Sequence, residues 1–135
     1  MAGIIAIGLG CRKDCASEAI IALVRRALAN CSDVEGVRRL FSVADKCGEP
    51  GLRVAAEALR FDLTFLPREA LAAAAPRILT PSAAAQRRFG LSSIAEAAAL
   101  AGAGPDAKLL APRLAANGAT CAVAFVPDRK PDDCA

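Results

Sequence analysis

The sequence contains no histidine, tryptophan or tyrosine, and its aromatic content is only 4%. Without histidine the chain has no Ser-His-Asp or Cys-His nucleophilic pair, no imidazole acid–base group and no histidine-ligated zinc site. Hydrophobic residues nevertheless make up 55% of the chain. Because aromatics are so few, the core must consist of alanine, leucine, valine and isoleucine at close spacing, as in tightly packed alanine-rich helices.

The sequence also lacks a strong excess of charge and a long apolar run. Lys and Arg number 17 against 14 Asp and Glu, whereas nucleic-acid-binding domains usually combine a clustered basic face with stacking aromatics. The apolar run in residues 1–7 has no basic segment before it and is too short for a signal peptide or a membrane span. We therefore expect a cytoplasmic protein that binds neither nucleic acid nor a membrane.

The six cysteines follow no familiar disulfide framework, and in the cytoplasm they are expected to be reduced thiols. Cys31 and Cys121 fall in apolar segments and are expected in the core. Cys11, Cys15 and Cys47 would lie near one another if their loops converge, which raises the possibility of a metal or iron–sulfur site. Their spacing matches no recognised ligand motif, so we predict no metal and no cofactor.

Apolar periodicity predicts one domain over residues 1–126, with a disordered tail over 127–135. The fold class is α/β: a three-layer α/β/α arrangement around a mixed, mainly parallel sheet of about five strands. Asp14 is the expected N-cap of the first helix, and Ser93 with Glu96 forms a capping box. The expected strands are residues 3–7, 37–44, 61–66, 107–111 and 119–126, and the expected helices are 16–31, 50–59, 68–75, 80–90 and 93–102.

Two loops are candidates for a ligand site because ligands of open α/β sheets bind beyond the carboxyl ends of the strands. Residues 8–13 follow the first strand and residues 45–49 follow the second, so parallel strands would place both loops at one edge. Backbone N–H groups and the side chains of Arg12, Lys13 and Lys46 then favour an anion. The alternative is that the glycines only permit a tight turn and the cations are solvated.

Nucleotide binding is not the expected use of this turn. Lys13 occupies the third glycine position of the dinucleotide fingerprint, and no Gly-Lys-Ser/Thr follows to make a P-loop. For acid–base chemistry the candidates are Asp45 and Glu49, with Lys46 as an electrostatic stabiliser. Loop solvation and helix capping are the favoured explanation of these carboxylates, because no second catalytic group is identifiable beside them.

Several segments occur in a distinctive order: residues 8–13 (GLGCRK), 45–52 (DKCGEPGL), 80–82 (TPS), 90–100 (GLSSIAEAAAL), 109–113 (LLAPR) and 119–124 (ATCAVA). Together these segments resemble the CobE family of cobalamin biosynthesis, and the same domain is similar to the C-terminal part of CbiG, the cobalt-precorrin hydrolase of the anaerobic pathway. The chain departs from the family where Asp14 and Cys15 replace a glycine and a small hydroxyl residue.

The resemblance implies a role around precorrin intermediates of the aerobic pathway to vitamin B12. Such ligands carry several carboxylates on a broad apolar macrocycle, which suits a cleft with arginines, lysines and backbone N–H groups. The expected ligand-binding residues are Gly8, Gly10, Cys11, Arg12, Lys13, Lys46, Thr80, Ser82 and Arg113.

Three functions are compatible with that role. The first is a carrier that binds a precorrin or corrinoid intermediate. The second is a hydrolase or rearrangement enzyme acting on a precorrin side chain or lactone, with Asp45 or Glu49 as base. The third is a scaffold for other enzymes of the pathway.

Overall fold

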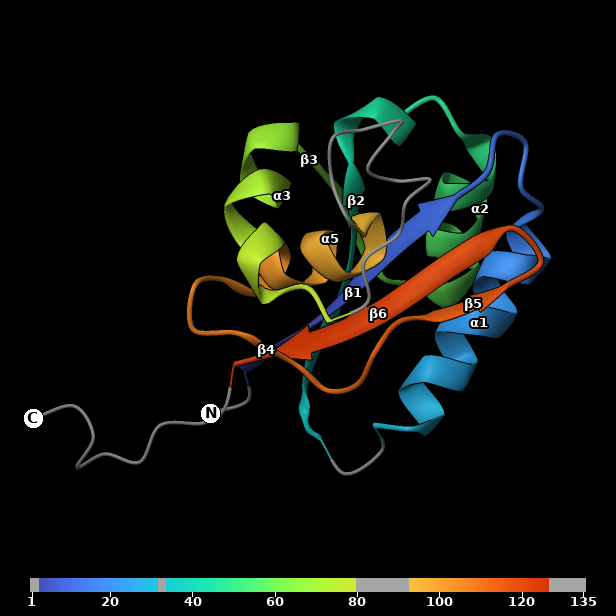
Figure 1. Cartoon of the computed structure of the whole chain (residues 1–135). Coiled ribbons are helices and arrows are strands. Elements are labelled where there is room, and N and C mark those ends of the chain that lie inside the picture. The colour runs from blue at the N-terminus through green and yellow to red at the C-terminus, as the bar shows by residue number, and fades with distance from the viewer. Residues whose placement is uncertain (1–2, 32–33, 80–92, 127–135) are drawn as a thin grey trace, which may run out of the picture.

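The computed structural model describes residues 3–31, 34–79 and 93–126, which form one sheet with helices on both faces (Figure 1). In chain order the elements are β1 (Gly3–Cys11), α1 (Ser17–Ala29), β2 (Gly36–Val43), the 3-10 turn η1 (Ala44–Lys46), α2 (Pro50–Leu59), β3 (Asp62–Leu66), α3 (Arg68–Ala74), the 3-10 turn η2 (Ala75–Arg77), α5 (Ile94–Ala103), β4 (Lys108–Leu109), β5 (Leu114–Ala116) and β6 (Ala119–Phe125).

The sheet is mixed, with strand order β3-β2-β1-β6-β4 and with β5 also paired to β6. Strands β1, β2 and β3 run parallel to one another, and β6 lies antiparallel to β1. Gly10 pairs with Thr120 and Cys11 with Ala119, so β6 begins beside the end of β1. The hairpin before β6 therefore lies at the same edge of the sheet as the turn that follows β1.

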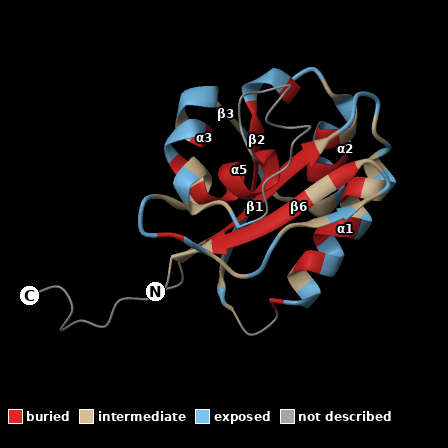
Figure 2. Ribbon diagram, viewed as in Figure 1, coloured by how far each residue is buried: buried red, intermediate tan, exposed pale blue. Residues whose placement is uncertain are grey.

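Helices α1 and α2 cover one face of the sheet, and α3 and α5 cover the other. Figure 2 shows that the sheet and α5 form the buried centre of the molecule. Alternate residues of β1 point to opposite faces. Ile5, Ile7 and Leu9 pack with α1 and α2, whereas Ala6 packs on the other side with α5.

Small residues let α5 lie directly on the sheet. A Cβ atom added to Gly8 would sit 1.9 Å from the carbonyl oxygen of Ala95, and one added to Gly102 would sit 2.5 Å from the ring of Phe41. The expected alanine-rich, closely packed core is therefore present, and α5 is its most tightly packed element.

The structure confirms the predicted three-layer α/β/α fold and its mixed sheet, with one more strand than the expected five. The additional strand is β5, which lies between the strands expected over residues 107–111 and 119–126. Its alanines pair with β6 across a hairpin whose tip is Asn117 and Gly118, with φ of 52° and 85°. Asn-Gly is a strong signal for a tight hairpin turn.

Two predictions about helix caps have different outcomes. Ser93 is the N-cap of α5 and accepts a hydrogen bond from the amide of Glu96, as predicted. Asp14 is not the N-cap of α1, because Ala16 occupies that position without a side-chain cap. The expected helix over 80–90 and the tail over 127–135 lie outside the described residues.

Candidate functional site

The turn after β1 and the loop after β2 meet at the carboxyl edge of the sheet, as the parallel strands predicted. The amide of Asp14 donates a hydrogen bond to Oε2 of Glu49 at 2.8 Å, which joins the two loops directly. On its other side the turn is tied to the β5–β6 hairpin, since the amide of Arg12 donates to the carbonyl of Gly118 at 2.8 Å. The turn is therefore held from both flanks.

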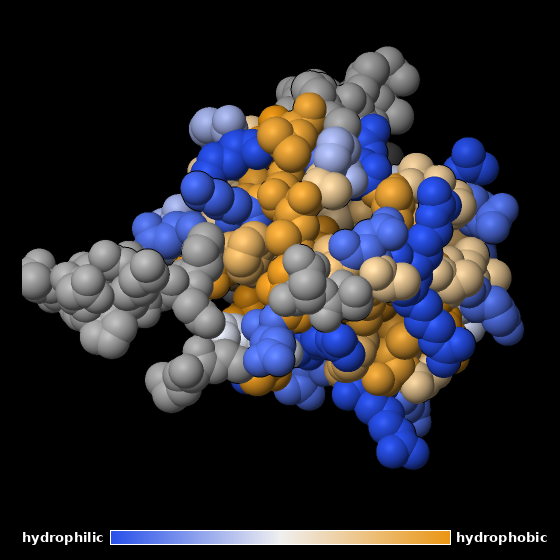
Figure 3. All heavy atoms as spheres, turned by 90° about the horizontal axis from the view of Figure 1, so that it is seen from below, coloured by the Kyte–Doolittle hydropathy of each residue, from blue (hydrophilic) through white to orange (hydrophobic). Residues whose placement is uncertain are grey.

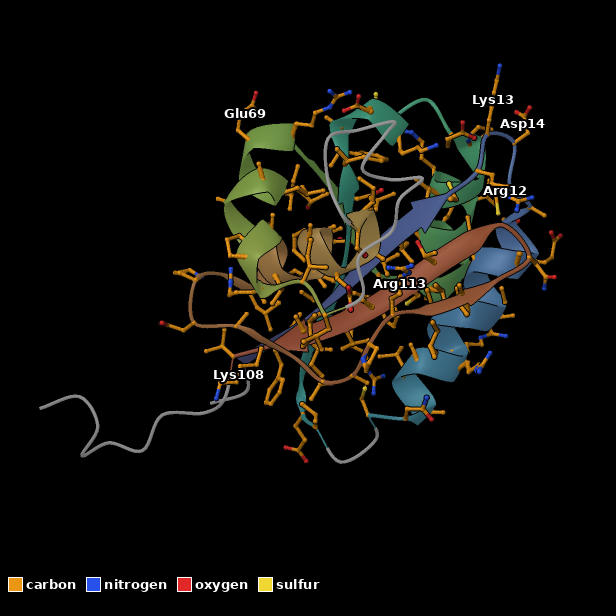
Figure 4. The ribbon with its side chains drawn as sticks, in the orientation of Figure 1. Arg12, Lys13, Asp14, Glu69, Lys108 and Arg113 are labelled. Carbon is orange, nitrogen blue, oxygen red and sulfur yellow. The ribbon has the colours of Figure 1, made fainter. Side chains whose placement is uncertain are left out.

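The cations of this edge divide into two kinds. Arg12 and Lys13 are exposed, and Figure 4 shows both at the end of β1 with Lys13 directed away from the body of the protein. The aliphatic part of Arg12 packs near Gly118, 3.3 Å from the place a Cβ would take. Lys46 is only 5% exposed, and its charge acts on the thiols of Cys11 and Cys15. A ligand at the surface would therefore meet Arg12 and Lys13, and Lys46 would act through its electrostatic field.

Two half-buried thiols lie under the same turn. Burial is the main cause that raises the pKa of Cys11 to about 11, and the neighbouring Lys46 lowers it in part. Burial also raises the pKa of Cys15, with the Glu49 carboxylate as the second cause. Both side chains therefore stay protonated at neutral pH, which does not favour a role as nucleophile or metal ligand. Cys47 is exposed on the neighbouring loop.

Asp45 is engaged by an arginine that the sequence did not point to. Arg68, at the start of α3, donates Nε to Oδ1 of Asp45 at 3.3 Å and Nη2 to Oδ2. The hydrogen bond from Arg68 is the main reason that the pKa of Asp45 is lowered. A carboxylate with a lowered pKa is a weaker base, so this contact disfavours the acid–base role predicted for Asp45.

A second arginine fixes the middle of the same loop. Arg53 of α2 donates Nε and Nη2 to the carbonyl of Cys47 at 3.3 and 3.1 Å, and its guanidinium lies 5.3 Å from the ring centre of Phe65. Cation–π contact and the paired hydrogen bonds both restrain the guanidinium. No sequence motif pointed to Arg53 or Arg68, because Phe65 and Asp45 meet these arginines only in the folded protein.

The two glycines of the turn motif are both buried, on the side of the sheet that faces α5. Gly8 lies beneath α5, and its lack of a side chain serves helix packing. At Gly10 a Cβ would sit 2.6 Å from Oγ1 of Thr120 and 3.5 Å from the Cβ of Ile94. The start of α5 therefore lies next to the end of β1. The structure places neither glycine at the exposed surface of the turn.

Arg113 lies apart from the turn. Its amide donates to Oε2 of Glu96 at 3.3 Å, and Glu96 is fully buried in the first turn of α5. The neighbouring Leu114 pairs with Cys121, which pairs with Leu9, so Arg113 lies several residues short of the edge where Arg12 is found. Figure 4 likewise shows Arg113 beside β6 and away from Arg12. Thr80 and Ser82 fall outside the described residues.

Other surfaces of the described part of the chain are weaker candidates for a ligand site. An apolar pocket between α1, β5 and β6 has a volume of about 30 Å³, too small for a macrocycle. Figure 3 shows the opposite edge of the sheet, where apolar side chains form a band with charged residues beside it. In the described ranges there is no group of three or more His, Cys, Asp or Glu residues placed to hold a metal ion. No helix of these ranges is long and apolar enough to cross a membrane.

The fold and this edge define the class of protein: a three-layer α/β domain with a basic turn, held on both flanks, at the carboxyl end of its first strand. The family model described as Cobalamin synthesis G C-terminus matches residues 5–124. The chain therefore belongs to this family.

Comparison with individual proteins gives the same assignment. The chain is 36% identical to Protein CobE of Sinorhizobium sp over 119 residues, which cover 87% of this chain and 77% of that relative. Its structure is similar to the crystal structure of CobE, a protein from the cobalamin (vitamin B12) biosynthetic pathway, with a TM-score of 0.86, 36% identity and coverage of 96% of this chain and 95% of the other.

A second solved structure is that of cobalamin biosynthesis protein chiG from Agrobacterium tumefaciens, with a TM-score of 0.69, 37% identity and coverage of 92% of this chain and 99% of the other. These matches confirm the resemblance to the CobE family that the sequence motifs indicated. The chain is a protein of cobalamin biosynthesis.

Proposed function

We propose that this protein binds a corrinoid intermediate through the carboxylates at the edge of the corrinoid. The protein then stores this intermediate or passes it from one enzyme of the pathway to another. The main support is the turn that carries Arg12 and Lys13, because hydrogen bonds hold it to Gly118 on one flank and to Glu49 on the other. A turn fixed in this way loses little conformational entropy when a ligand binds. Two exposed cations on such a turn suit a polycarboxylate better than a neutral ligand.

Three of the other predicted residues bear on this function in different ways. Lys46 adds positive potential beneath the turn, and Cys11 fills the space under it. Arg113 lies far enough from Arg12 that it would meet a different carboxylate, which only a broad ligand such as a corrin ring can supply. A catalytic role for Asp45 and Glu49 is less well supported, because both carboxylates are engaged by hydrogen bonds from the protein.

Binding is tested by titration with hydrogenobyrinic acid, followed by the shift of its visible absorption bands. We expect the double variant Arg12→Ala/Lys13→Ala to bind about tenfold more weakly than wild type, because each exposed ion pair contributes up to about 1 kcal/mol. Binding should also weaken as salt is added. Arg25→Ala is the matched control, since Arg25 is exposed on α1 and away from the turn.

Two results would contradict the proposal. One is the absence of any association with wild type at high micromolar hydrogenobyrinic acid. The other is association that the double variant and the Arg25→Ala control weaken equally, which would place the ligand elsewhere.

A further inference from the structure

We propose that Glu49 is a positioning residue: its carboxylate holds Asp14 in a left-handed backbone conformation and so sets the course of the turn that carries Arg12 and Lys13. The contact itself stands on the geometry of the two loops. Its consequence for ligand binding rests on the function proposed above.

Asp14 is in a backbone conformation that a hydrogen bond from outside the turn would stabilise. Its φ is 61°, in the left-handed region that residues other than glycine rarely adopt. Within the turn, the amide of Cys15 donates to the carbonyl of Arg12 at 3.2 Å, which closes the chain around Asp14. The bond from the Asp14 amide to Glu49, at 2.8 Å, is shorter and comes from a different loop.

Glu49 is itself well anchored. It is the N-cap residue of α2, its amide donates to the carbonyl of Lys46 at 3.0 Å, and its carbonyl accepts from the amide of Leu52 at 3.3 Å. Two residues before it, the carbonyl of Cys47 accepts hydrogen bonds from Nε and Nη2 of Arg53. The carboxylate is therefore presented from a fixed backbone, which is what a positioning residue requires.

The contact also decides which groups of the turn can meet a ligand. A backbone N–H in a turn of this kind is a ready partner for an anion, and here the chain's own carboxylate already accepts from the amide of Asp14. A ligand carboxylate is then met by the side chains of Arg12 and Lys13. In this arrangement the Glu49 carboxylate supports the backbone of the turn and does not act as a base.

The first test measures hydrogen exchange of the Asp14 amide by NMR, without ligand. In Glu49→Ala this amide should exchange about tenfold faster than in wild type, because a hydrogen bond to a charged acceptor is lost. Glu49→Gln keeps an acceptor oxygen and should exchange close to the wild-type rate. The Ala6 amide in β1 is the internal reference, and Glu57→Ala, on the exposed side of α2, is the matched control variant.

The second test is a rescue. Asp14→Gly removes the penalty for a positive φ, so the double variant Glu49→Ala/Asp14→Gly should regain much of the hydrogenobyrinic acid affinity that Glu49→Ala loses. A role of Glu49 as base or as a charge on the ligand would not be restored by a glycine at position 14. Retention of affinity in Glu49→Gln distinguishes positioning from a need for negative charge.

The outcomes separate this inference from the proposed function. Unchanged exchange at Asp14 in Glu49→Ala would overturn the inference, and so would tighter ligand binding, which would mean that Glu49 occupies the ligand's place. Equal loss in Glu49→Gln and Glu49→Ala would also overturn it. If the exchange pattern is as expected but wild type does not bind hydrogenobyrinic acid, then the positioning role is supported and the carrier function fails.

Discussion

At the scale of single residues, Gly8 and Gly48 differ in what surrounds their α-carbons. Gly8 lies under α5 with the Ala95 carbonyl in the place of a side chain, whereas a Cβ on Gly48 would meet nothing within 4 Å. Both glycines belong to the loops and turns that the sequence marks as a ligand edge. Only their surroundings in the folded protein show that Gly8 serves the contact between a helix and the sheet.

This difference predicts opposite effects of the same substitution. Gly8→Ala should force α5 away from β1 and destabilise the fold by about 2 kcal/mol or more, which lowers the Tm by roughly 5–10 °C. Gly48→Ala should leave the Tm unchanged or raise it slightly, since alanine reduces the entropy of the unfolded chain. Thermal unfolding followed by circular dichroism measures both, and equal Tm values for the two variants would contradict the packing role of Gly8.

Residue roles were predictable where they depend on local sequence. Ser93 caps α5 because its hydroxyl reaches an amide three residues away, a contact that the capping-box pattern encodes. The partners of Asp14 and Asp45 lie 35 and 23 residues away in the chain and depend on how loops and helices meet. Spacing along the sequence carries no record of such contacts, so the assignment of Asp14 as an N-cap was wrong and the roles of Arg53 and Arg68 were missed.

At the scale of elements, the ion pair between Asp45 and Arg68 joins η1 to the first residue of α3. It connects the loop after β2 to the helix after β3. Arg68 holds the pKa of Asp45 below its ordinary value of 3.8, mainly by hydrogen bonding. A group whose pKa is lowered by folding contributes stability above its unfolded pKa, and that contribution is lost as pH falls through the folded pKa.

The pair therefore predicts a specific change in acid stability. The contribution of Asp45 should be complete above about pH 4 and should decline at lower pH, so Asp45→Asn should flatten the dependence of Tm on pH in that range. Because both side chains are partly exposed, the effect should shrink in high salt. Asp62→Asn, an exposed carboxylate at the start of β3, is the control. Parallel pH curves for wild type and Asp45→Asn would contradict the prediction.

Most elements were predictable because apolar periodicity reports burial. The strands β1 and β6 are almost continuous apolar runs, β2 is apolar and buried in its second half, and α1 and α2 each carry one apolar face. The short strand β5 was missed because three residues are too few to show a period. Its pairing with β6 follows from the hairpin turn at Asn117 and Gly118, a local signal whose consequence depends on the partner strand.

At the scale of the whole molecule, the described cysteines differ in how deeply the fold buries them. Cys47 is exposed, Cys11 and Cys15 are half-buried, and Cys31 and Cys121 are buried, as predicted for the last two. Burial is also the main cause that raises the pKa of Cys121 to about 12. Accessibility therefore falls from Cys47 to Cys121, and burial raises the pKa of Cys121 further than that of Cys11.

Alkylation of the native protein should follow that order. Among the cysteines that the structure describes, iodoacetamide at pH 8 should modify the exposed Cys47 first. Cys11 should react more slowly, because burial limits access to its thiol and raises its pKa to about 11. Cys121 should react only on unfolding. Peptide mass mapping measures each rate, with the denatured protein as the control in which the differences disappear. Comparable native rates at Cys121 and Cys47 would contradict the fold.

The three-layer architecture was predictable from the alternation of buried strands and amphipathic helices, and the family was predictable from short motifs in order. The detailed site was not, because it is assembled from four separate segments: the turn after β1, the loop after β2, the hairpin before β6 and the start of α3. The turn after β1 and the loop after β2 could be placed together from the sequence, because both follow parallel strands. The other two required the antiparallel position of β6 and the packing of α3.

The pairing of β1 with β6 has one more consequence. A Cβ on Gly3 would lie 3.5 Å from the carbonyl oxygen of Val126, so the first and last described residues adjoin each other at the edge opposite the basic turn. A folded body that the chain enters and leaves at neighbouring positions can be joined to another protein, inserted into a loop, or circularly permuted with a short linker. None of these rearrangements would obstruct Arg12 and Lys13, so the same edge can operate in proteins of very different length.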